Sequence, residues 1–101
     1  MDAAFALLAD PGRRRIVEML LTGERSVNEV CAVLPISQPG VSKHLKVLRD
    51  GGLVRVRADG QKRLYSLDPA PLRDLDQWLE PFRAFWGDKL DALERHLDQE
   101  S

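Results

Sequence analysis

Two serines eleven residues apart constrain the fold most strongly, because each of them can begin a short helix. Ser26 opens the pattern Ser-Val-Asn-Glu, in which its hydroxyl can accept from the backbone amide of Glu29 while the Glu29 carboxylate reaches back to Ser26. Ser37 opens a second pattern, whose apolar face consists of Val41, Leu45 and Leu48. The first helix must end by Pro35, so the sequence predicts two short helices joined by a tight turn.

The residues after the second of these helices predict a β hairpin. Gly51 stands where a helix commonly ends on a residue in the left-handed conformation. Residues 53–58 then alternate apolar and basic side chains, and residues 61–67 return as a second strand after the turn Asp59-Gly60. We therefore expect a two-stranded wing behind the two helices.

Two further helices are predicted at the start of the chain. Asp2 can cap a short apolar helix, and Asp10 followed by Pro11 marks the beginning of another that runs to Gly23. The inward stripe of this second helix consists of Ile16, Met19 and Leu20.

Three consecutive arginines, residues 13–15, fall in the first turn of that helix, where the helix dipole disfavours cations. Such a position calls for a compensating partner. Pairing of Arg14 with Glu18 one turn on is the simpler explanation, and contact with a phosphate is the alternative.

Charge is unevenly distributed along the chain, although its net charge is only -1. Residues 37–67 hold seven Lys or Arg against two acidic residues, whereas residues 68–101 hold four against nine. The local field decides where a polyanion binds, so the middle third is the candidate nucleic-acid surface. A solvated basic face without a ligand is the simpler alternative.

Length and composition indicate one small domain over residues 1–101, of 11.4 kDa. Its single cysteine, Cys31, cannot form an internal disulfide, and we see no secretory signal pattern. No apolar run approaches the roughly 20 residues that cross a bilayer. We therefore expect a cytoplasmic protein that does not bind membranes.

The helix that begins at Ser37 carries side chains suited to reading DNA. Gln38 can form a bidentate pair with adenine, and Ser42 can bond to any base edge. Small residues near the start of the helix would let it approach the major groove closely. His44 lies nearer the core edge, where it can be either a packed histidine or a DNA contact.

The stretches "SQPGVSKHLKVLRDGGLV" and "RADGQKRLYSL", with "LADPGRRRIVEMLL" before them, resemble the winged helix-turn-helix of ArsR/SmtB-type bacterial repressors. The resemblance covers most of the chain. It implies a mostly α-helical fold with a two-stranded β wing, and a homodimeric repressor that binds an inverted-repeat operator. The residues expected to contact DNA are Ser37, Gln38, Pro39, Gly40, Ser42, Lys43, His44, Lys46, Arg57, Gln61, Lys62 and Arg63.

The chain departs from the metal sensors of that family. Where they typically have a Cys-Val-Cys pattern in the third helix, this sequence has Ser26-Val27-Asn28, and its terminal segment offers only His96. A zinc or soft-metal site needs several converging donors, so we expect no metal and no cofactor. Cys31 is interpreted as a packed small hydrophobe, with a reactive sensor thiol as the alternative.

The terminal segment predicts a helix over about residues 69–98 with a long apolar stripe, kinked or broken at Pro81. A second copy of the chain would cover its aromatic residues, although they could instead fold back onto Phe5 and Leu8. The expected dimer interface consists of Phe5, Leu8, Leu75, Trp78, Leu79, Phe82, Phe85, Trp86, Leu90, Leu93 and Leu97.

Enzymatic function is not indicated. The sequence has no nucleophile and base at a recognisable spacing and no phosphate-binding glycine loop. The expected function is DNA-binding transcriptional regulation with an unknown inducer. The alternative is a winged-helix module that binds an acidic protein partner through its basic wing.

Overall fold

The computed structural model describes residues 2–100, with side chains through residue 99. Helix α1 spans Asp2–Leu8, and α2 spans Pro11–Met19 and continues into a short 3-10 turn, η1, at Leu20–Thr22. The predicted cap at the start of α2 is confirmed, because the Asp10 carboxylate accepts from the backbone amide of Arg13 at 3.0 Å.

Two of the three arginines in the first turn of α2 bind the end of α1, so the predicted pairing of Arg14 with Glu18 is wrong. Arg13 donates from Nε to the carbonyl of Leu7 at 2.6 Å, and Arg14 donates from Nη1 to the carbonyl of Leu8 at 2.8 Å. The last carbonyls of a helix lack partners within it, and its C-terminal dipole end favours cations. The dipole at the start of α2 disfavours these two cations, but the dipole at the end of α1, which they contact, favours them.

The two central helices match their prediction. Helix α3 spans Val27–Val33 and begins with the full capping box, in which Ser26 accepts from the Glu29 amide at 3.2 Å and its own amide donates to Glu29 at 3.0 Å. Helix α4 spans Gln38–Asp50, and the Ser37 hydroxyl accepts from the amide of residue 40 at 3.3 Å.

The end of α4 lies one residue later than predicted. Gly51 has a φ of -84° and belongs to the helical turn, whereas Gly52 has a φ of +83°. The amide of Leu53 donates to the carbonyl of Leu48 at 3.0 Å, which is the long bond of a Schellman motif. A Cβ on Gly51 would collide with the end of the Leu7 side chain of α1, so a side chain at this position would require Leu7 to move.

Strands β1, Val54–Asp59, and β2, Lys62–Leu67, form the predicted antiparallel wing. Asp59 pairs with Lys62, so the two turn residues are Gly60 and Gln61, one position later than expected. Gly60 has a φ of +63°, a conformation that suits glycine at the first turn position.

The core lies where α2, α3, α4 and the base of the wing meet. All three residues of the predicted apolar face of α4 have no exposed area, and Ile16, Val30 and Leu53 join them. Fully burying one such side chain stabilises the fold by about 1.5–3 kcal/mol. This core fixes α4 between α2 on one side and the wing on the other.

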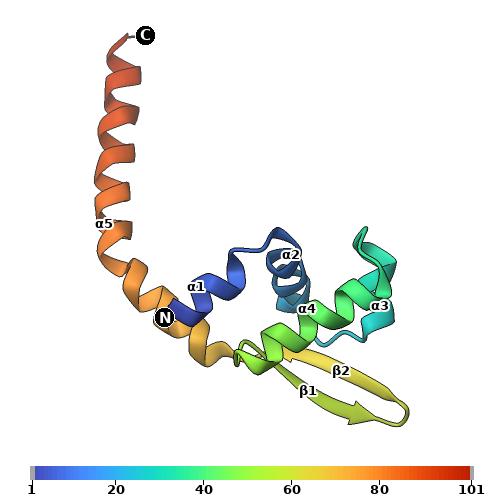
Figure 1. Ribbon diagram of the computed structural model, residues 1–101. Coiled ribbons are helices and arrows are strands. Elements are labelled where there is room, and N and C mark those ends of the chain that lie inside the picture. Colours follow the sequence, from blue (N-terminus) through green and yellow to red (C-terminus); the bar gives the residue numbers. More distant parts are fainter. Residues whose placement is uncertain (1, 101) are drawn as a thin grey trace.

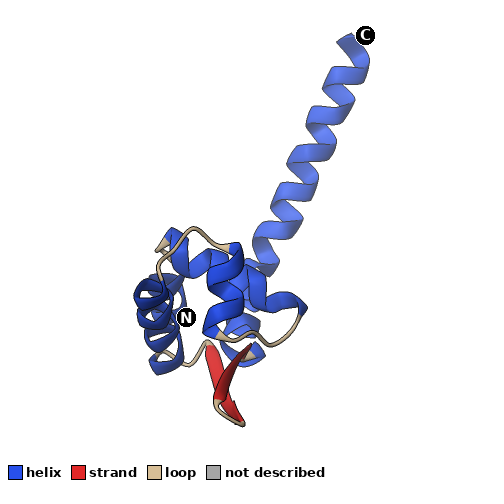
Figure 2. Ribbon diagram, turned by 90° about the vertical axis from the view of Figure 1, so that its right-hand side faces the viewer, coloured by secondary structure: helices blue, strands red, loops and turns tan. Residues whose placement is uncertain are grey.

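Helix α5, Pro69–Glu100, leaves this body and extends away from it (Figures 1 and 2). The molecule therefore measures 61 × 28 × 20 Å along its principal axes. Pro81 lies within one continuous helix, which changes direction partway along its length (Figure 1). The expectation of a kink is met and that of a break is wrong, since a proline bends a helix by removing one hydrogen bond.

Candidate nucleic-acid interface

One face of α4 carries polar and cationic side chains opposite the buried stripe. Gln38, Ser42, Lys46 and Arg49 follow each other at intervals of four, four and three residues, so they lie on one side of the helix. All four are exposed. The face changes from neutral at the start of α4 to positively charged at its end.

This face and the wing together line a groove with a volume of about 500 Å³. The wing contributes the exposed residues Gln61, Lys62 and Arg63 and the buried Tyr65. The start of α3 contributes Ser26, Val27 and Asn28. The charged residues that line the groove are Lys46, Arg49, Lys62 and Arg63. Among the described residues that line it, none is acidic, so the groove favours an anionic ligand such as a phosphate backbone.

The segment before α3 holds the wing in place. Arg25 and Tyr65 exchange two backbone hydrogen bonds, of 3.0 and 2.9 Å. Next to them, Arg57 donates from Nε and Nη2 to the two carboxylate oxygens of Glu24 at 2.7 and 2.8 Å. The hydrogen bond from Arg57 lowers the pKa of Glu24 below its usual value of 4.5. Arg57, predicted from sequence to face DNA, therefore already has an anionic partner.

The structure brings together six of the residues predicted to contact DNA. They line the groove from two elements and are Gln38, Ser42, Lys46, Gln61, Lys62 and Arg63. Pro39 and Lys43 are exposed on α4 but do not line the groove. The Ser37 hydroxyl caps α4, which engages it within the protein.

Gly40 faces the turn between α3 and α4. A Cβ at this position would lie 3.0 Å from Ile36 Cγ2 and 3.2 Å from Ser37 Oγ. The lack of a side chain therefore relieves crowding inside the turn, and contact of Gly40 with DNA stays a prediction.

His44 faces α2 and is partly buried. Its Nε2 lies 3.9 Å from Asp10 Oδ1, and its side chain is 23% exposed. The hydrogen bond from the Arg13 amide lowers the pKa of Asp10 below 3.8, and the nearby imidazole lowers it further. This position agrees with the packed alternative, and contact of His44 with DNA stays a prediction.

Five residues that line the groove were not predicted from the sequence, and they are Ser26, Val27, Asn28, Arg49 and Tyr65. Arg49 continues the stripe that begins at Gln38, so extending the helical spacing by one more turn would have found it. Asn28 reaches the groove from α3, and nothing in its local sequence indicates this, because only the packing of α3 against α4 places it there.

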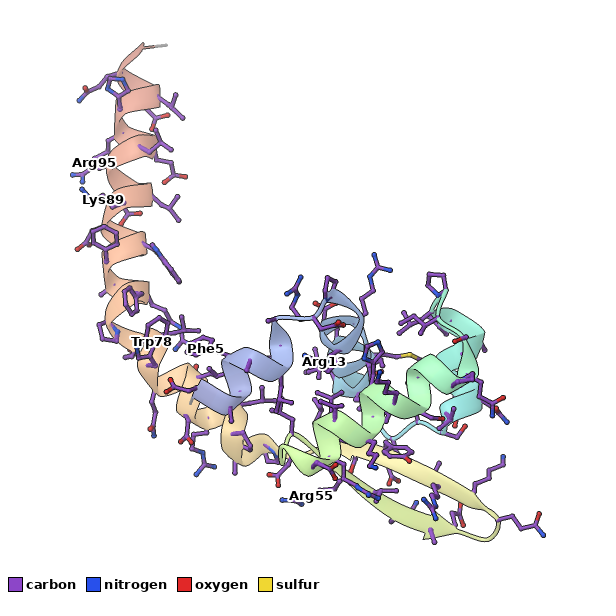
Figure 3. All side chains as sticks on the ribbon, in the orientation of Figure 1. Phe5, Arg13, Arg55, Trp78, Lys89 and Arg95 are labelled. Carbon is purple, nitrogen blue, oxygen red and sulfur yellow. The ribbon has the colours of Figure 1, made fainter. Side chains whose placement is uncertain are left out.

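The apolar side chains expected at a dimer interface lie on two surfaces. Leu8, Leu75 and Leu79 are partly buried within the chain, and Phe5 packs edge-on against Trp78 with ring centroids 5.3 Å apart (Figure 3). The residues of the farther half of α5 remain exposed, from 39% at Phe82 to 62% at Leu90, and the others are Phe85, Trp86, Leu93 and Leu97. Folding back onto α1 covers the near part of the stripe only incompletely, since Phe5 and Trp78 are still 43% and 42% exposed.

Cys31 is partly buried and packs against the core, in agreement with its structural interpretation. Within residues 2–100, no group of three or more His, Cys, Asp and Glu side chains could hold a metal ion. The same part of the chain contains no helix that is both long and apolar enough to span a bilayer.

The helix pair, the wing and the cationic groove between them define a winged helix-turn-helix protein. The sequence profile of the "Bacterial regulatory protein, arsR family" matches residues 10–56. The HTH-type transcriptional regulator Rv2034 of Mycobacterium tuberculosis is 42% identical over 99 residues, which cover 98% of this chain and 90% of that protein. The chain belongs to the ArsR family of DNA-binding transcriptional regulators, and it is not an enzyme.

Two further comparisons agree with this assignment. The arsenical resistance operon repressor of Staphylococcus aureus is 38% identical over 77 residues, covering 76% of this chain and 74% of the repressor. A crystal structure of a possible transcriptional regulator for arsenical resistance superposes with a TM-score of 0.70 at 43% identity, covering 92% of this chain and 93% of that one. The predicted fold class and family resemblance are thereby confirmed.

Proposed function

We propose that this regulator is a homodimeric repressor that binds an inverted-repeat operator in the cytoplasm and covers promoter DNA. The observation that carries the proposal is the groove between α4 and the wing, which is lined by four cations and, among the described residues, by no acid. Helix α4 enters the major groove by its N-terminal end, and the DNA backbone follows the groove toward the wing.

Within this site the neutral residues read bases and the cationic residues hold phosphates. Gln38 and Ser42 lie near the N-terminal end of α4, where a recognition helix comes nearest to base edges. Lys46 and Arg49, farther along the helix, lie across the groove from the wing cations. The residues that we assign to the DNA surface are Ser37, Gln38, Pro39, Gly40, Ser42, Lys43, Lys46, Arg49, Gln61, Lys62 and Arg63.

The exposed stripe on α5 supports dimerisation. Large apolar side chains are exposed along α5 from Trp78 to Leu97, and contiguous exposed apolar patches mark protein–protein interaction sites. The acidic charge of residues 68–101 would keep this helix away from DNA. We assign residues 1–101 to a single DNA-binding domain in which α5 pairs with its counterpart in a second copy.

Salt dependence of binding tests the proposal. Duplexes that the chain selects from a random pool should bind it with a steeply negative dependence on salt, because bound Lys and Arg release counterions from the phosphates. Removing one groove cation, as in Arg49→Gln, should reduce that slope by about one unit. A chain that binds no duplex but captures acidic proteins would instead support the protein-interaction alternative.

We further propose that no divalent metal or arsenite controls release from the operator. The two positions where a Cys-Val-Cys pattern would place thiolates are Ser26 and Asn28, and Ser26 already caps α3. Titration of zinc, cadmium or arsenite into the protein–operator complex should leave its affinity unchanged. Stoichiometric release by any of the three would contradict this prediction.

A further inference from the structure

Helix α1 is joined to the rest of the molecule by an unusual set of hydrogen bonds. Arg13 donates to the carbonyls of Leu7, at 2.6 Å, and Ala6, at 3.3 Å. Arg14 donates from a single nitrogen to the carbonyls of Leu8, at 2.8 Å, and Ala9, at 3.1 Å. Two adjacent side chains of α2 thus bind four consecutive carbonyls at the end of α1, an arrangement that we call the arginine clasp.

A clasp of this kind matters because α1 cannot hold its own position. It has seven residues, whereas isolated helices shorter than about 12–15 residues are marginal in water. Apolar packing through Ala4, Leu7 and Leu8 holds it against the body, but such packing is non-directional. Hydrogen bonds to four named carbonyls fix how far α1 can slide or turn on α2.

Helix α1 lies between the recognition helix and the proposed dimer helix. On one side its Leu7 side chain occupies the space that a side chain on Gly51 would need at the end of α4. On the other side Phe5 packs edge-on against Trp78 of α5, and Figure 3 labels the two residues where α1 meets α5. A shift of α1 would therefore move α5 relative to α4.

From these contacts we infer that Arg13 and Arg14 are positioning residues that set the distance and angle between the two recognition helices of the dimer. The inference rests on the proposed function, since it requires a dimer formed through α5. Two α4 helices that read an inverted repeat must lie about 34–36 Å apart, one turn of DNA. The clasp fixes this geometry within each copy by holding α1, and with it Trp78, against α2.

The test compares the wild-type chain with Arg13→Met/Arg14→Met, which keeps much of the side-chain length and loses the donors. The backbone amide of Arg13 still donates to Asp10, so α2 keeps its cap. The matched control is Arg15→Met, because Arg15 is exposed and makes no hydrogen bond or ion pair with any other described residue. Three duplexes are used: the inverted repeat selected by the wild type, the same repeat with one inserted central base pair, and a single half-site.

The double variant should bind the single half-site as the wild type does, and the selected repeat roughly tenfold more weakly, because the second contact is no longer pre-oriented. It should also discriminate less against the inserted base pair. The Arg15→Met control should behave as the wild type. If the double variant does not fold, Arg13→Lys/Arg14→Lys replaces it, because lysine keeps the charge but lacks the planar guanidinium with its several donors. It should show the same loss of spacing preference, to a smaller extent.

Unchanged affinity for all three duplexes would overturn the inference. So would an equal loss on the half-site and the repeat, because that result would place the arginines on DNA or in general stability. A wild-type chain with no spacing preference would refute the proposed dimer itself, and the inference with it, which separates that failure from a failure of the clasp alone.

Discussion

Base reading by this regulator is assigned to two neutral side chains on a face that is otherwise cationic. Gln38→Ala or Ser42→Ala should weaken binding to the operator by about 1–3 kcal/mol and leave binding to random duplexes nearly unchanged. Lys62→Ala, in the same groove, should weaken both. Titrations on the two kinds of duplex measure the ratio, and an unchanged ratio for Gln38→Ala would show that α4 is not the reader.

At this scale the sequence could predict side chains but not their partners. The outward residues of α4 follow from helical spacing alone; Gln38, Ser42 and Lys46 line the groove, whereas Pro39 and Lys43 do not. Arg57 was predicted to face DNA, but its partner Glu24 lies 33 residues away in sequence. Only the fold brings these two together, and the same is true of Asn28.

At the scale of elements, four carboxylates stabilise the places where one element begins or where two elements meet. The carboxylates of Asp10, Glu29 and Asp68 accept from backbone amides at the starts of α2, α3 and α5, and that of Glu24 binds Arg57 of the wing. For Asp10 and Asp68, the leading cause of the lowered pKa is a backbone hydrogen bond, from the amides of Arg13 and Ala70 respectively. For Glu29 it is the hydrogen bond with the backbone of Ser26, and for Glu24 it is that from Arg57.

These directions predict how stability depends on pH. A carboxyl group whose pKa is lower in the folded state stabilises the fold fully above its unfolded pKa, here 3.8 for Asp and 4.5 for Glu. That contribution is lost as the pH falls through the lower, folded value. The contribution of these groups to the free energy of unfolding should thus stay constant down to about pH 5 and fall below it.

Urea unfolding of the wild type and of Glu29→Gln at several pH values measures this effect. Glu29→Gln should be less stable at neutral pH and should lose less stability below pH 5, because it has one such carboxylate fewer. Equal losses in the two chains would contradict the role given to this cap.

Most elements could be predicted because their signals are local. The capping box of α3, the Asp10 cap and the alternating strands all lie within a few residues of what they determine. The end of α4 was placed one residue early because both Gly51 and Gly52 can stop a helix, and the choice depends on where Leu53 is buried. The arginine clasp could not be predicted, since its acceptors belong to another helix.

At the scale of the whole molecule, the farther half of α5 projects from the body (Figure 2). The apolar side chains of this part of the helix are exposed. Trp86→Glu should place a charge in the proposed dimer interface on α5 and yield a mostly monomeric chain. This chain should lose operator affinity, although its DNA-facing residues are intact. Leu21→Glu is the control, because Leu21 is 70% exposed and belongs to η1, not to α5. A Trp86→Glu dimer would place the interface elsewhere, most simply on α1.

The mass of the protein–operator complex tests the central claim most directly. Analytical ultracentrifugation of the full chain, with the inverted repeat that it selects, gives the number of chains on each duplex. The account predicts two chains, bound in one step, because each half contacts too few phosphates and bases to bind tightly alone. One chain on each duplex, bound with the full affinity of the operator, would contradict it.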